Sequence, residues 1–245
     1  MLQGNWASQA CLEKPADIKS HYFDMAVDSM QDTTPLTQSS VYHEYATFSE
    51  RQYHAIAKSP DVLRLKVYIE RKTAEIRSRE DHLSQLRLQG KTPVFVELQG
   101  YKNKAEKLLA TDKALYTEYL KSRNTFLQRA IEMYSRTLAG SDKYDDDAAI
   151  RLCSLWFANF DSTDDDLPSK IGTALALVPS HKFVFLAHQL SARLSEAEIA
   201  TDRSSNQANL QRIVLRMCKD HPFHALFPVY CLQGDTVIKI GRAHV

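Results

Sequence analysis

Glycine and proline are scarce in this chain, and their scarcity restricts the possible folds more than any other feature. Among 245 residues there are 7 glycines and 8 prolines, and residues 61–89 contain neither. β-Sandwiches and barrels need many tight turns, which glycine and proline usually supply. The sequence therefore predicts long helices and an all-α fold.

Two segments are long enough to form extended helices. The triplet at 59–61, Ser-Pro-Asp, combines a capping residue, a proline for the first helical position and an acid for the first turn. The helix that it starts should reach about Leu88, with one thin apolar stripe and many charges. A second helix should run from about Glu97 or Lys102 to Leu138. Because the connection is short, we expect the two to pack antiparallel.

Shorter helical patterns fill the remaining chain. Residues 15–30 place apolar side chains, Met25 among them, at three- and four-residue steps on one face. Ser49 and Gln52 fit a capping box, which predicts a new helix beginning at Ser49. Further helices are predicted at 149–160, 180–194, 210–218 and from Pro222.

Helix follows helix along the chain without a strict repeat period. The signature residues of tetratricopeptide and ankyrin repeats are absent. We therefore predict an α-solenoid of degenerate helix-turn-helix repeats, similar to tetratricopeptide or HEAT arrays, that includes the two long antiparallel helices. Trp156, Phe183 and Phe185 should lie in its core.

Charge and cysteine content argue against several classes of protein. The net charge is +1, from 31 basic and 30 acidic residues, which gives no electrostatic signature of nucleic-acid or membrane-surface binding. The cysteines are scattered without a C-x-x-C pair, so we expect free thiols in a reducing compartment. No apolar run of about 18 residues and no signal-peptide pattern is present. We therefore expect an intracellular chain that contacts neither nucleic acid nor membrane.

Two groups of aspartates could in principle hold a cation. They are Asp142, Asp145, Asp146 and Asp147, and Asp161, Asp164, Asp165 and Asp166. A helix-loop-helix calcium site needs ligands at alternate positions, a central glycine and a terminal glutamate. Neither group has that arrangement, so we interpret both as solvated loop charge.

Two histidines lie three residues apart, at His221 and His224. On one helix this spacing could offer two metal ligands, but no third ligand is visible. Asp220 could instead cap a helix that Pro222 starts. We favour structural roles for both histidines, with metal binding as the alternative.

Sequence motifs for catalysis are missing. The chain has no nucleophile elbow, no Cys/His signature, no phosphate-binding glycine loop and no protein-kinase catalytic loop. We therefore predict no catalytic, cofactor-binding or metal-binding residues in this chain.

Several short motifs occur in a fixed order along the chain. They are GNW at 4–6, CLEKPA at 11–16, FSERQY at 48–53, RLCSLW at 151–156, HKF at 181–183, QLSARL at 189–194, DHP at 220–222 and HALF at 224–227. This ordered set resembles the FAT region of ataxia-telangiectasia mutated (ATM)-type kinases, which belong to the phosphatidylinositol-3-kinase-related kinase family. The resemblance covers nearly the whole chain.

The resemblance implies a fold and a context. In that family the region consists of helical repeats that support a kinase domain, which follows in the sequence and uses ATP and Mg. The family kinase phosphorylates Ser or Thr before Gln in the nuclear response to DNA double-strand breaks, and acts as a homodimer. The expected partners are the chain's own kinase domain, neighbouring repeats, a second copy of the parent and proteins of the DNA damage response. Ser8, Thr37 and Ser84 precede glutamine and are candidate autophosphorylation sites, although such pairs also arise by chance.

The resemblance fades past about Gly234. Residues 240–245 read IGRAHV, which a common sequencing-library adapter encodes when translated in frame. We expect residues 1–234 to form the helical repeat segment and 235–245 an irregular tail, whose last six residues are adapter read-through on a truncated transcript. A native, mobile tail is the alternative.

The leading interpretation is a regulatory, non-catalytic helical segment of an ATM-like serine/threonine protein kinase. A stand-alone helical-repeat adaptor for protein partners is the second interpretation. A helical metal-dependent enzyme that uses the aspartate groups or His221 and His224 is the third.

Overall fold

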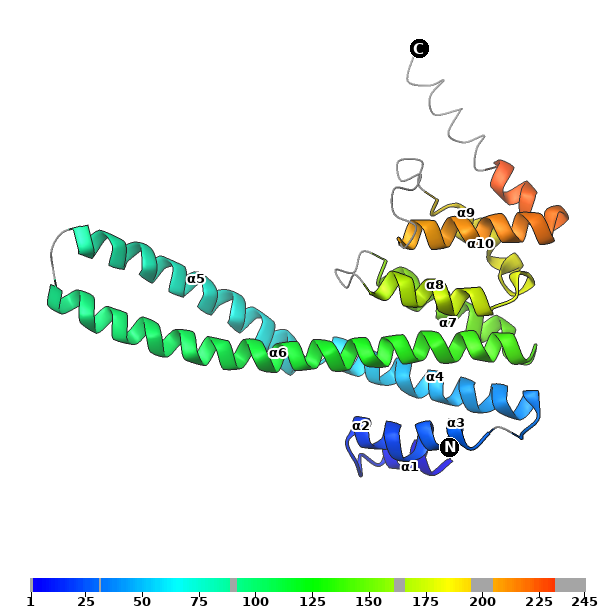
Figure 1. Ribbon diagram of the computed structural model, residues 1–245, viewed down its shortest axis with the longest axis horizontal. Helices are drawn as coiled ribbons and strands as arrows, with labels where there is room; N and C mark the ends of the chain where they lie inside the picture. Colours follow the sequence, from blue (N-terminus) through cyan, green and yellow to red (C-terminus); the bar gives the residue numbers. More distant parts are fainter. Residues whose placement is uncertain (1, 31, 89–91, 161–165, 195–204, 232–245) are drawn as a thin grey trace, which may run out of the picture. The chain divides into compact units, whose positions relative to one another are not determined.

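The computed structural model describes residues 2–30, 32–88, 92–160, 166–194 and 205–231 (Figure 1). Within these ranges every regular element is a helix, which confirms the predicted all-α class. The chain forms two compact units, of which the smaller is Arg51–Phe126 and the larger combines Met1–Glu50 with Leu127–Val245. The boundaries between the units fall inside two long helices, α4 (Pro35–Ala57) and α6 (Thr92–Gly140).

The smaller unit contains a hairpin of two long helices. α5 (Pro60–Leu88) and the first part of α6 run antiparallel, side by side (Figure 1). The Nζ atom of Lys102 on α6 lies 2.7 Å from Oε1 of Glu80 on α5. Ile76, Leu83 and Leu109 are buried. The predicted antiparallel pair is confirmed, although α6 begins at Thr92, earlier than predicted.

The larger unit begins with a layer of short helices. These are α1 (Leu2–Gln9), α2 (Pro15–Ile18), the π-helical η1 (Lys19–Asp24) and α3 (Met25–Asp28). A π-helical turn holds more residues than an α-helical turn, so the buried face shifts along the segment. Phe23 is therefore completely buried, while Met25 is 63% exposed, and the prediction for Met25 is wrong.

The helix α4 packs on this first layer and on α6. The rings of Phe23 and Phe48 stack with centroids 4.4 Å apart, and Ser39 Oγ donates to the carbonyl of Thr137 at 3.0 Å. α4 continues without a break through Ser49, whose side chain is buried. The prediction of a helix start at Ser49 is therefore wrong, because Phe48 and Ser49 face the interior of an unbroken helix.

The rest of the larger unit consists of shorter helices. They are α7 (Asp145–Ala158), α8 (Leu167–Leu177), the 3₁₀-helical η2 (Ser180–Leu186), α9 (Ala187–Ser191), α10 (Asn206–Asp220) and a helix at 222–231. Trp156 and Phe183 are fully buried, as predicted, whereas Phe185 is 46% exposed, contrary to the prediction. The 3₁₀ geometry of η2 turns Phe185 outward, because successive turns repeat every three residues rather than every 3.6.

Two predictions concern parts outside the described residues. The tail at 235–245 and most of the second aspartate group, Asp161, Asp164 and Asp165, lie there. In the described part of the chain, none of the helices has both the length and the apolar character needed to span a membrane.

Candidate functional site

A groove of about 450 Å³ lies between α6 and α8 in the larger unit. Its floor is apolar and includes Ile131 from α6 and Ile171 and Ala174 from α8. These three side chains are at most 6% exposed, so the floor is closely packed. The walls are more open, and Leu177 is 54% exposed at one end.

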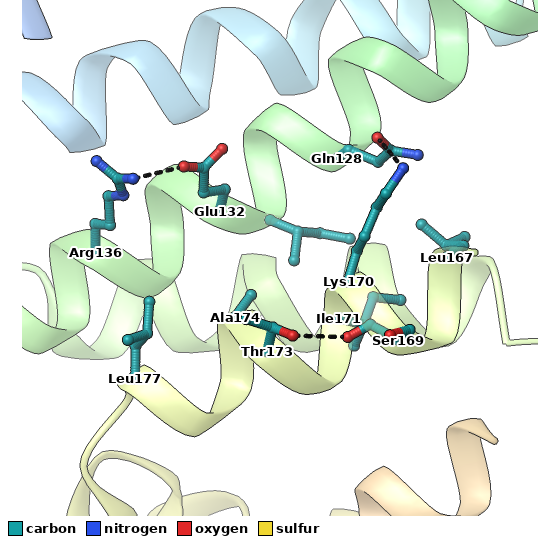
Figure 2. A pocket seen from close by; sticks show the side chains of 11 residues that line it. Gln128, Glu132, Arg136, Leu167, Ser169, Lys170, Ile171, Thr173, Ala174 and Leu177 are labelled. Carbon is teal, nitrogen blue, oxygen red and sulfur yellow. Dashed lines mark hydrogen bonds and ion pairs between the residues drawn. The ribbon is translucent and has the colours of Figure 1, made fainter. Parts of the chain in front are cut away.

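Polar side chains border the groove at both ends. Figure 2 shows Lys170 beside Gln128 toward one end and Arg136 beside Glu132 toward the other. Lys170 Nζ donates to Oε1 of Gln128 at 3.1 Å, and Arg136 Nη2 lies 2.8 Å from Oε1 of Glu132. The groove thus combines an apolar floor with paired polar side chains at its ends, and an apolar lining with a few polar groups is typical of ligand-binding pockets.

A buried lysine joins η2 to the start of α7. The side chain of Lys182 is 2% exposed, and its Nζ donates to Asp142 and, at 2.7 Å, to both carboxylate oxygens of Asp145. Burial alone would lower the pKa of Lys182, but the bonds to the two aspartates outweigh burial and raise it. The hydrogen bond from Lys182 lowers the pKa of Asp142 in turn. The cluster is a charge-compensated tie between segments far apart in sequence.

A second polar contact joins η2 to the end of α10. Ser180 Oγ donates to Oδ2 of Asp220 at 2.6 Å and lies 3.3 Å from Nε2 of His221. Ser180 is the first residue of η2 and follows the N-cap residue Pro179. Together with Lys182, this contact fixes the position of η2 between α7 and α10.

A polar network joins α4, α6 and α7. Arg151 Nη1 lies 3.0 Å from Oε2 of Glu50, which also accepts from the hydroxyl of Tyr134 at 2.6 Å. His43 Nε2 lies 2.9 Å from Oδ2 of Asp147, which is bonded to Arg151 through its other oxygen. The bonds from Arg151 and His43 outweigh the effect of burial and lower the pKa of Asp147. The network is structural, because its charged groups are satisfied by one another.

The first aspartate group was only partly predicted correctly. Asp145, Asp146 and Asp147 form the first turn of α7, where acids are favoured by the helix dipole, and not a loop. Asp142 and Asp145 both pair with Lys182, but only the interpretation of Asp145 as solvated charge is wrong, because Asp142 lies in the loop and is 90% exposed whereas Asp145 is 26% exposed. The reason is that Lys182 lies 40 and 37 residues away from them in the sequence, which a local pattern cannot reveal.

The remaining candidates lie where α10 ends and the helix at 222–231 begins. Asp220 is the last residue of α10 and accepts from Ser180, and His224 lies in the helix at 222–231. Among the residues that the structure describes, no three His, Cys, Asp or Glu side chains are grouped so that they could hold a metal ion. Cys153 is buried, which raises the pKa of its thiol to about 12, so it is protonated at neutral pH.

Asn206 was missed by the sequence analysis. Its Oδ1 accepts from Nε1 of the buried Trp156 at 2.9 Å, and its Nδ2 donates to the carbonyl of Phe160 at 2.6 Å. A buried indole N–H needs such a partner. The polar composition around Asn206 hid this role, since a local pattern shows polarity but not burial.

The hairpin unit differs from the rest of the chain in charge. Residues 51–126 contain 16 basic and 9 acidic residues, a net charge of +7, and the remainder contains 15 basic and 21 acidic residues, a net charge of −6. Tyr101, Leu108 and Leu115 follow one another at seven-residue steps on α6 and are 55%, 65% and 43% exposed. Apolar residues at this spacing form one stripe along a helix. The hairpin therefore presents an apolar stripe within a basic surface.

Comparison with known proteins finds similar sequences within large kinases. No protein-family model matches it. The serine/threonine-protein kinase tel1 of Emericella nidulans is 30% identical over 231 residues, which are 94% of this chain and 8% of that protein. The serine-protein kinase ATM of Sus scrofa is 26% identical over 241 residues, covering 94% of this chain and 7% of that protein. The chain thus spans only a small part of these relatives.

Two solved structures are similar in fold. A structure described as the FAT and kinase domain of CtTel1 aligns with a TM-score of 0.69 and 26% identity, over 92% of this chain and 14% of that one. A structure described as the complete CtTel1 dimer with C2 symmetry aligns with a TM-score of 0.67 and 25% identity, over 91% of this chain and 8% of that one. The similarity in sequence and in fold covers the same, nearly complete, part of the chain.

Proposed function

Because this chain belongs to the Tel1/ATM family of serine/threonine kinases, as a segment of the helical FAT region, we propose that it is a regulatory scaffold of such a kinase. The observation that carries this proposal is the agreement in fold and sequence with the CtTel1 structure over 92% of the chain. The parent protein would phosphorylate Ser or Thr before Gln in the response to DNA double-strand breaks. Its location would accordingly be the nucleus.

The proposed mechanism is mechanical rather than chemical. Stacked helices have few stable arrangements, so a shift of one layer can bias an attached domain between inactive and active states. In the larger unit, Lys182 and Ser180 join η2 to α7 and α10, so these elements should move together. ATP and Mg would bind in the kinase domain of the parent, and this segment would supply no catalytic group.

The partners follow from the same reasoning. The segment would pack against neighbouring helical repeats and its own kinase domain, and the parent would form a homodimer, as the CtTel1 relative does. The exposed stripe of the hairpin, with a net charge of +7 around it, is the surface that we propose for contact with the acidic part of a second copy. The other expected partners are proteins of the DNA damage response. The segment itself would bind neither nucleic acid nor membrane directly.

The proposal is tested by comparing the 245-residue chain with its full-length parent. Each would be incubated with ATP, Mg and a peptide that contains Ser-Gln, and phosphate transfer would be measured. We expect transfer by the parent and none by the 245-residue chain. We also expect Lys182→Met in the parent to change the rate, whereas Lys14→Met, at an exposed site of the larger unit, should not. Phosphate transfer by the 245-residue chain alone would contradict the proposal.

The adaptor hypothesis makes a different prediction about the gene. Long reads of the transcript through the codon for Gly234 would be compared with the genome. A reading frame that continues into a kinase domain supports the scaffold and identifies residues 240–245 as adapter sequence. A stop codon after Val245 in genomic DNA would favour the stand-alone adaptor.

A further inference from the structure

The helix at 222–231 packs on the larger unit with one face and leaves the opposite face open. Ala225 is 1% exposed, whereas Phe223 is 95% exposed and Phe227 and Tyr230 are also largely exposed. These three aromatic residues and Leu226 follow the i, i+3, i+4, i+7 spacing that places side chains on one side of a helix. An open hollow of about 420 Å³ lies on this side. We call Phe223, Leu226, Phe227 and Tyr230 the uncovered face.

The start of this helix is fixed in place by polar contacts. Ser180 Oγ on η2 donates to Asp220 and lies 3.3 Å from Nε2 of His221, the residue before the helix. The backbone N–H groups of His224 and Ala225 both donate to the carbonyl of His221 at 3.1 Å. Figure 1 shows the helix in orange and red next to α10, at the end of the stack of helices in the larger unit. The uncovered face therefore has a defined orientation at the end of that stack.

The composition of this helix is that of a protein interior. Residues 222–231 read PFHALFPVYC and contain no Lys, Arg, Asp or Glu. Interfaces that form and dissociate are about as apolar as the remaining protein surface, whereas permanent interfaces resemble a core cut in two. A helical array that ends in solution also carries a capping repeat with a polar outer face. The uncovered face therefore suits a permanent neighbour within the same array.

We propose that the uncovered face is the binding surface for the next helix of the parent protein, encoded after Gly234 and absent from this chain. The inference rests on the proposed scaffold function and names the surface through which the segment joins the rest of the array. The chain spans 8% of the Emericella nidulans relative and 14% of the CtTel1 FAT and kinase structure, so a parent of similar length would supply further helices. The next helix would be amphipathic, and its apolar residues would pack between Phe223 and Tyr230.

A second copy of the chain is the main alternative occupant. The first layer of the larger unit also exposes apolar side chains, Trp6 and Met25 among them, so two copies in head-to-tail contact would bury both ends. Such a contact is heterologous and would continue into open filaments unless the rotation closed a ring. The next helix of the parent is favoured because its covalent connection keeps it at a high effective concentration near the uncovered face.

The proposal can be tested by supplying the next helix to the 245-residue chain as a separate peptide. The peptide spans the first amphipathic helix that the genomic reading frame encodes after Gly234, and a scrambled peptide of the same composition is the control. Isothermal titration calorimetry should detect binding of the native sequence only, with a negative change in heat capacity because apolar surface is buried. The affinity should vary little with salt concentration, since residues 222–231 carry no charged side chain.

A matched pair of variants shows whether the uncovered face is the binding site. Leu226→Glu should weaken binding of the peptide about tenfold or more, because it places a charge within an apolar interface. Leu36 and Leu226 are 53% and 51% exposed, so Leu36→Glu, at the start of α4, is the control and should bind normally. Phe227→Ala should also weaken binding, since it removes an aromatic anchor. Circular dichroism would establish that each variant remains folded.

The outcomes separate this proposal from the scaffold function. A peptide that does not bind would overturn the proposal, as would binding that Leu226→Glu and Phe227→Ala leave unchanged. Self-association of the chain that Leu226→Glu abolishes and the peptide does not displace would identify a second copy as the occupant. In each of these cases the scaffold function stands, because none of the measurements depends on kinase activity. A genomic stop codon after Val245 would instead overturn both.

Discussion

The hairpin unit and the larger unit bury their side chains to different depths. The largest fully buried side chains, which include Trp156, Tyr45 and Tyr134, all belong to the larger unit. In the smaller unit the buried apolar side chains remain 3–8% exposed, from Phe126 at 3% to Val62 and Leu109 at 8%. A layered helix is covered on two sides, whereas each helix of a two-helix hairpin is covered on one. The difference shows that stacking, rather than helix length, produces a closed core.

The two units also use their charges differently. In the larger unit charged groups join separate helices, as Lys182 does with Asp142 and Asp145. In the hairpin several pairs lie within one helix, such as Glu75 with Lys72 and with Arg79. Pairs within an exposed helix contribute little stability. The ion pairs of the hairpin should therefore contribute less to folding than the contacts between helices in the larger unit.

The largest effect should come from removing the central side chain of the layered core. Trp156→Ala would leave a cavity and deprive Asn206 Oδ1 of its donor, and should cost about 4 kcal/mol of unfolding free energy. Chemical denaturation followed by circular dichroism would measure it. Ile150→Ala, on the same helix but 52% exposed, is the control and should cost less than about 0.5 kcal/mol. Equal costs at the two positions would contradict a closed core around α7.

A matched leucine pair tests the comparison directly. Leu138 and Leu109 both lie on α6, but Leu138 is completely buried in the larger unit and Leu109 is 8% exposed in the hairpin. Leu138→Ala should cost about 3 kcal/mol and Leu109→Ala about 1.5 kcal/mol, because the hairpin can close more easily around a lost side chain. Hydrogen exchange resolved along α6 would report each unit separately. If Leu109→Ala proved the more costly, the comparison would be reversed.

Lys182→Met should have an intermediate effect. The methionine fills a similar volume but leaves Asp142 and Asp145 without their donor, at a cost of about 2 kcal/mol. The cost is moderate because Asp142 is 90% exposed and can be solvated by water. Denaturation of Lys182→Met with and without Asp145→Asn would measure the coupling between the two residues. Strict additivity would show that the contact contributes no stability.

The pH dependence of stability provides an independent test of the same contact. The pKa of Asp142 is lowered, so its contribution is present above its ordinary value of 3.8 and is lost as the pH falls through the lowered value. The pKa of Lys182 is raised, so its contribution is present below 10.5 and is lost as the pH rises through the raised value. Both declines should be shallower in Lys182→Met, as measured by melting temperature. An unchanged pH profile would contradict the assignment.

Sequence reasoning succeeded where the signals were local and failed where the partners were distant. Both long helices could be predicted, because the triplet at 59–61 and the absence of glycine and proline act within the helix itself. The capping box at Ser49 was a valid local signal, but packing of Phe48 in the interior kept α4 continuous. Tertiary contacts routinely override such signals.

The buried polar contacts and the groove show the same division between local signals, which could be predicted, and distant partners, which could not. Trp156 could be assigned to the interior from its apolar surroundings. Lys182 and Asn206 could not, because their partners lie between 37 and 50 residues away and no periodicity connects them. The groove at α8 could not be predicted either, since its two walls come from helices separated by α7.

The smallest effect should come from the surface of the hairpin. Glu75 accepts from Lys72 at 2.7 Å and from Arg79 at 2.6 Å on the same exposed face of α5. Glu75→Gln removes both ion pairs and raises the net charge of the hairpin, yet the melting temperature of the chain should not change measurably, because solvent and salt screen such pairs. The substitution should instead strengthen any association with an acidic partner, which sedimentation at low salt would detect. A clear drop in melting temperature would mean that ion pairs within its helices stabilise the hairpin. The two units would then differ in the kind of interaction that stabilises them, and not only in how deeply their side chains are buried.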